Sequence, residues 1–85
     1  MQFRIEHVLV HAGNAQVMAR SLESGDFALT NHATLGGVPI RPVVTSPRAL
    51  RDDGTPDLDV FVFLLQRASD AACLVVGQTV TLSPS

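Results

Sequence analysis

The sequence predicts an all-β fold, a closed antiparallel β-barrel of six or seven short strands. Three observations support this. Short apolar or alternating runs recur between Gly, Asn, Asp and Pro turns, no segment keeps a helical period over ten residues, and 46% of the 85 residues are hydrophobic. A closed barrel also leaves no unpaired sheet edge. We therefore expect a single β-barrel domain at residues 1–82, with 83–85 as a loose C-terminal tail.

The first expected strand covers residues 2–10, QFRIEHVLV. Phe3 and Ile5 share one face, and the apolar set then moves by one position to Val8 and Val10. Since strand side chains alternate between the two faces, this change of parity predicts a β-bulge near Glu6 or His7.

Two further strands are expected before residue 31. The residues HAGN at 11–14 predict a turn, because Gly and Asn tolerate positive φ. AQVMARSL at 15–22 and DFALT at 26–30 then read as two strands joined by Glu23-Ser24-Gly25.

The middle of the chain predicts an irregular strand followed by a loop. Gly36-Gly37 is expected to turn the chain, and the next run, VPIRPVV, contains Pro39 and Pro42. Because proline donates no ladder hydrogen bond, this run is an edge strand, a bulged strand or two short pieces. PRALRDDGTPD at 47–57 reads as an ordered loop with one helical turn at 48–51.

The last third contains the most apolar run, LDVFVFLLQ at 58–66. Phe61 and Phe63 share one face of this expected strand, and both faces are expected to be covered. Residues 69–72 predict one helical turn with Ser69 as its N-cap. LVVGQTVTL at 74–82 supplies the last strand or two.

The order of these elements resembles the β-barrel that forms the second domain of elongation factor Tu and related translational GTPases. The markers of this resemblance, which spans residues 8–82, are Val17-Met18, Leu22-Glu23, Gly25, Leu29, the acidic turn before VFVFLL, Gly77-Gln78 and Val80. The chain departs from the family pattern at Arg20, Thr30 and Val76. The matching residues form turns and core, so the resemblance implies the barrel fold and no activity. No G-x-x-x-x-G-K-[ST] motif occurs, so we expect no GTP binding.

Composition restricts the partners. The chain has six Arg, no Lys and a formal net charge of −2, which argues against non-specific nucleic-acid binding because that requires a basic footprint. No apolar run approaches a membrane span, and the N-terminus does not resemble a secretory signal. We expect a cytoplasmic protein with no membrane partner and no cofactor.

Two sets of side chains are candidate sites. His7 and His11 lie four residues apart on one strand face and could bind a metal ion together with His32 or Cys73. The spacing matches no known ligand motif, so structural or surface histidines are the favoured interpretation. Arg20, Arg41, Arg48 and Arg51 could converge on a patch that binds an anion or phosphate. The alternative is a solubilising surface.

Other reactive side chains give no catalytic pattern. Cys73 lies among apolar residues and is expected to be a buried, inert thiol. The paired carboxylates Asp52-Asp53 and Asp57-Asp59 read as solvated turn residues. We therefore expect a non-catalytic module that binds a protein or RNA partner. A metal-dependent or other small enzyme using His7, His11 and His32, and a homo-oligomeric structural subunit, are the alternatives.

Overall fold

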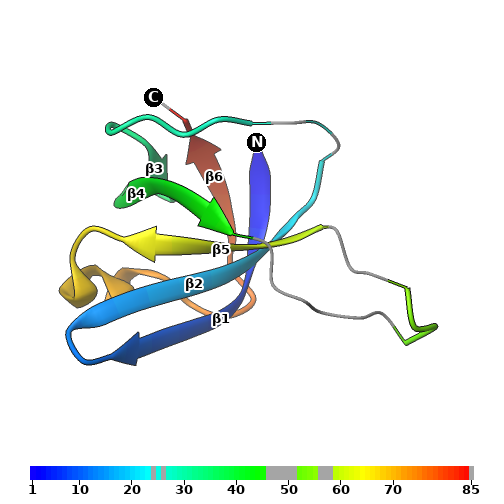
Figure 1. The fold of residues 1–85 in the computed structure, drawn as a ribbon, viewed down its shortest axis with the longest axis horizontal. Helices are drawn as coiled ribbons and strands as arrows, with labels where there is room; N and C mark the ends of the chain where they lie inside the picture. Colours follow the sequence, from blue (N-terminus) through cyan, green and yellow to red (C-terminus); the bar gives the residue numbers. More distant parts are fainter. Residues whose placement is uncertain (24, 26, 46–51, 56–58, 85) are drawn as a thin grey trace.

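The computed structural model describes residues 1–23, 25, 27–45, 52–55 and 59–84. These residues form a closed antiparallel barrel in the order β1-β2-β5-β4-β3-β6 (Figure 1), which confirms the predicted fold class with six strands in the described part. The elements are β1 (Gln2–His11), β2 (Asn14–Ser21), β3 (Thr34–Leu35), β4 (Val38–Thr45), β5 (Val60–Leu65), the 3₁₀-helix η1 (Ala68–Cys73) and β6 (Thr79–Ser83). The predicted helical turn at 48–51 lies outside the described residues.

The last strand closes the barrel. β6 pairs with β1 on one side, where Phe3 lies opposite Val80, and with β3 on the other, where Leu35 lies opposite Leu82. All four of these side chains are buried. The strand near the C-terminus, β6, is thereby paired with the strand at the N-terminus, β1. The apolar faces of all six described strands enclose a common core.

The predicted bulge in β1 is confirmed. The register of β1 against β2 shifts between Ile5 and His7. Ile5 is fully buried, and Val8, three residues later, also packs against the core. The bulge therefore keeps the apolar side of β1 facing inward although the sequence changes parity.

All four phenylalanines of the chain meet in the core. The Phe3 ring lies edge-on to Phe27, Phe61 and Phe63, with centroid distances of 5.7, 6.1 and 5.3 Å. Such pairs are each worth about 0.5–1.5 kcal/mol beyond their buried area. The aromatic group connects β1 with β5, which are not neighbours in the sheet.

β4 is the bulged strand that its prolines predict. Its register against β5 shifts between Ile40 and Val44, and Arg41, Pro42 and Val43 are exposed within the irregular part. Pro42 therefore lies where no regular ladder hydrogen bond is needed.

The strand predicted at 26–30 is wrong for its described part, since Phe27 to Thr30 form no strand. Phe27 and Leu29 both pack against the core, which produces the strand-like alternation. The amide of Thr30 bonds to the carbonyl of Pro84, but the strand beside β2 is β5 rather than this segment. The alternation of packed and exposed side chains in this segment therefore occurs without strand pairing.

The prediction that Cys73 is buried is also wrong, because its side chain is exposed. The segment before β6 begins with η1, whose 3₁₀ geometry repeats every three residues. Ala68, Ala71 and Leu74 follow this period and face the core. Cys73 lies between two of these positions and faces solvent.

The prediction that Ser69 is the N-cap of this helix is wrong. The helix begins with Arg67 as its N-cap, and no side chain caps it.

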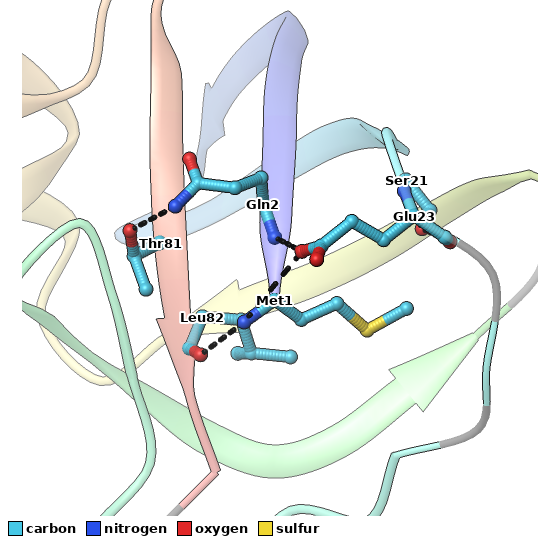
Figure 2. A network of polar contacts seen from close by, with 6 residues as sticks. All are labelled: Met1, Gln2, Ser21, Glu23, Thr81 and Leu82. Carbon is cyan, nitrogen blue, oxygen red and sulfur yellow. Dashed lines mark hydrogen bonds and ion pairs between the residues drawn. The ribbon is translucent and has the colours of Figure 1, made fainter.

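Polar contacts join the N-terminus to the strands beside it (Figure 2). The Met1 ammonium donates to the Leu82 carbonyl oxygen at 3.4 Å, and the Gln2 side-chain amide donates to Thr81 Oγ1 at 2.7 Å. The Glu23 carboxylate accepts from the backbone N–H of Gln2 and lies 3.9 Å from the Met1 ammonium. These contacts support the β1–β6 pairing from both sides of β1. β6 itself continues to Ser83, one residue beyond the expected domain boundary.

Gly36 provides a test of how closely the closing strand packs. Gly36 and Gly37 both have positive φ, but only at Gly36 would a Cβ meet the Val80 side chain, 2.9 Å from Cγ1. Alanine at either site costs about 1–2 kcal/mol for the left-handed backbone. Gly36→Ala should lower the free energy of unfolding by roughly a further 1–3 kcal/mol through overpacking. Urea titration of both variants measures the difference, and equal losses would contradict this packing.

Candidate functional site

The β1–β2 hairpin ends at the part of the barrel that lies away from both termini (Figure 1). Its turn joins His11 to Asn14 through Ala12 and Gly13, whose φ angles are +50° and +79°. Two consecutive positive φ values define a type I′ turn, which suits the right-handed twist of the paired strands. Ala12 is the only non-glycine residue with positive φ among the described residues. The chain therefore accepts local strain at the hairpin tip.

Two adjacent large apolar side chains are exposed next to this turn. Leu9 is 61% and Val10 59% exposed. Consecutive strand residues point to opposite faces. Val10 has the inward parity of Val8, yet it lies too near the tip to be covered. Each face of the hairpin end therefore presents one exposed apolar side chain.

A partly open cavity of ≈ 400 Å³ lies against the same hairpin. Its lining residues are Leu9, Val10, His11, Ala12, Asn14 and Gln16. They combine aliphatic surface with amide and imidazole groups, and none is an acidic or strongly basic side chain. Such a site can hold an apolar side chain while hydrogen-bonding to the polar backbone around it.

The structure brings His7 and His11 together on one strand but separates them from His32. The two β1 histidines are exposed and lie opposite Met18 and Asn14 of β2. His32 lies in the turn before β3, which pairs with β4 and β6. The described residues contain no group of three His, Cys, Asp or Glu side chains able to hold a metal ion. His11 instead contributes to the hairpin cavity.

The candidate arginines do not form one described patch. Arg20 lies opposite Val60 at the start of β5, whereas Arg41 follows Ile40, which lies opposite Leu65 at its end. Five residue steps of β-strand separate these ends by about 17 Å. Arg48 and Arg51 lie outside the described residues.

Arg20 takes part in an ion-pair cluster on the outer surface. Its Nε–H donates to Glu6 Oε1 at 2.7 Å, and Arg4 Nη2 lies 3.4 Å from the same oxygen. The Arg20 hydrogen bond is the main reason that the pKa of Glu6 is lowered, with Arg4 contributing and partial burial opposing. The cluster lies at the residue at which β1 is bulged.

Sequence reasoning did not identify the hairpin end as a site. The available signal was the run Val8-Leu9-Val10 directly before a turn, where one of two adjacent apolar residues must face away from a core. No protein-family model, curated protein or solved structure matches this chain. Function is therefore inferred from the chain's own surface. Across the described ranges, no helix has the length and apolar character needed to cross a membrane.

The Glu6 cluster predicts a pH-dependent contribution to stability. Because folding lowers the pKa of Glu6 from 4.5, the ionised carboxylate stabilises the fold above that pH. The contribution, of up to about 1 kcal/mol for a surface pair, is lost as the pH falls through the folded-state pKa. Wild type and Glu6→Gln, compared by urea unfolding from pH 7 to pH 3, should differ most at neutral pH and converge in acid. A gap that does not change with pH would contradict the assignment.

Proposed function

We propose that this chain is a non-catalytic protein-interaction module that binds its partner through the end of the β1–β2 hairpin. The observation that carries the proposal is the exposed pair Leu9 and Val10 beside the cavity. Both residues line that cavity, and exposed apolar side chains gathered at one place mark interaction sites more often than scattered ones do. The closed barrel serves as the rigid support that presents them.

The charge of the site favours a protein over RNA. The residues that line the cavity carry no fixed positive charge, and the chain as a whole has a net charge of −2. RNA binding requires cations along the phosphate backbone and aromatic or planar groups for the bases. The four phenylalanines of the chain are occupied with one another in the core.

The resemblance to the second-domain barrel of elongation factor Tu supports the non-catalytic part of the proposal. Its markers occupy structural positions: Gly25 has a φ of +131°, VFVFLL forms β5, and Gly77-Gln78 holds the backbone of Ile5 just before β6. The 85 residues contain no GTP-binding motif, and the use that remains for a barrel of this type is surface recognition.

Affinity capture with matched variants tests the proposed function. Tagged wild type, Leu9→Asp and Val43→Asp are recovered from cross-linked cells of the source organism, and the bound protein and RNA are quantified. Val43 is 49% exposed on β4 and serves as the control. Loss of an interface anchor should reduce recovery of a specific protein roughly tenfold for Leu9→Asp alone. The proposal fails if no protein distinguishes the two variants, or if only RNA does.

A further inference from the structure

The pairing of β6 with β1 stops in the middle of β1. β6 pairs with residues 2–4, and the last contacts on this side are two hydrogen bonds of Ile5. Its N–H donates to the Gln78 carbonyl oxygen at 2.8 Å, and its carbonyl oxygen accepts from the Gly77 N–H at 2.7 Å. From His7 to His11, the described structure pairs β1 with β2 alone. The barrel is closed, but the outer half of β1 has an open edge.

The register identifies the backbone groups on this edge. His11 and Asn14 flank the two-residue turn and form a hydrogen-bonded pair. In an antiparallel ladder such pairs alternate with non-bonded ones, so Leu9 also bonds to β2, and Val8 and Val10 direct their N–H and C=O groups away from β2. No described backbone group bonds to Val8 or Val10 on that side. Their groups therefore form a short template for another strand.

The side chains around this edge are apolar. Four of the six exposed large hydrophobic residues in the described structure lie on this edge or in the loop where the contact of β1 with the β6 side ends. Leu9 and Val10 belong to the edge itself, and Val75 and Val76 directly precede Gly77, which bonds to Ile5. Soluble proteins normally protect an edge with charged residues or proline. Residues 7–11 contain neither Lys, Arg, Asp or Glu nor proline.

The sequence of the edge reads the same in both directions: His7-Val8-Leu9-Val10-His11. When two copies of such a strand run antiparallel about a two-fold axis at Leu9, each side chain meets one of its own kind. Val8 of one copy then lies opposite Val10 of the other, and these are the residues whose N–H and C=O groups are directed outward. A two-fold contact of this type requires a self-complementary surface, and the edge provides one in sequence, hydrogen bonding and charge.

We propose that the open edge of β1 is covered by the same edge of a second copy of this chain. Each Val8–Val10 pair exchanges two N–H···O bonds, and the two Leu9 side chains meet on the axis. The inference rests on the proposed function, since it takes the hairpin end as a binding surface and names the occupant. Because the contact is short, the dimer is a reversible one.

Sedimentation velocity from 1 µM to 1 mM tests the dimer. Wild type should shift with concentration from 9.1 kDa toward twice that mass. Val10→Pro removes an outward N–H and leaves the ladder to β2 complete, so it should weaken the dimer at least tenfold. Leu9→Lys places like charges on the axis and should do the same, whereas Val43→Lys should not. A monomer at all concentrations, or variants that dimerise like wild type, would overturn the proposal.

Disulfide cross-linking tests the register. Residues opposite each other in a non-bonded pair have Cα atoms about 4.5 Å apart, within the range of a disulfide. In a Cys73→Ser background, Leu9→Cys should therefore form a covalent dimer in mild oxidant. Leu22→Cys, at a site that is 46% exposed, is the matched control. Equal cross-linking of the two variants would overturn the register.

The outcomes separate this inference from the proposed function. One outcome is that wild type is monomeric at all concentrations and yet recovers a protein from cells that Leu9→Asp does not recover. In that case the second copy is excluded as the occupant, and the hairpin remains a binding surface. If neither self-association nor partner capture depends on Leu9, both proposals fail. A concentration-dependent dimer that cross-links through Leu9→Cys supports the inference.

Discussion

The pairing of β6 with β1 is the constraint on which the rest of this structure depends. It joins the last strand to the first around Phe3, which is fully buried and touches each of the other three phenylalanines. Without this pairing β1 and β6 would each have a free edge, and the aromatic group would lose its wall on the β6 side. The Met1 and Gln2 contacts to β6 add polar support along the same seam.

The bulge at Glu6 separates the two tasks of β1. Before it, β1 is a wall of the barrel with a neighbour on each side; after it, β1 is one arm of a hairpin that extends from the barrel. The extra residue restores the inward direction of Val8, while Arg4 and Arg20 hold the Glu6 carboxylate outside. β1 can therefore end its pairing with β6 without losing contact with the core. The end of that pairing leaves the outer half of β1 with an open edge.

Much of the fold could be predicted from local signals, because those signals act through adjacent residues. The parity change predicts the β1 bulge, the two prolines predict the irregular β4, and the run VFVFLL predicts β5. Phe27 to Thr30 and Cys73 were misassigned because alternation and apolar neighbours report burial and not sheet pairing. The candidate site was not predicted, since it depends on where β6 ends against β1. The extent of the β6–β1 pairing is set by the loop through Gly77 and Gln78, which lies at the other end of the chain from β1.

Amide hydrogen exchange at single-residue resolution tests the central claim that barrel closure ends at Ile5. In dilute solution, below the concentration at which the proposed dimer would form, the Ile5 amide should exchange only through global unfolding, because it bonds to Gln78 where β1 and β6 close the barrel. Leu9 should be protected by its pairing with β2, while Val8 and Val10 on either side of it should exchange at nearly unprotected rates. Protection of Val8 and Val10 equal to that of Ile5 would contradict the account, since β1 would then be covered along its whole length.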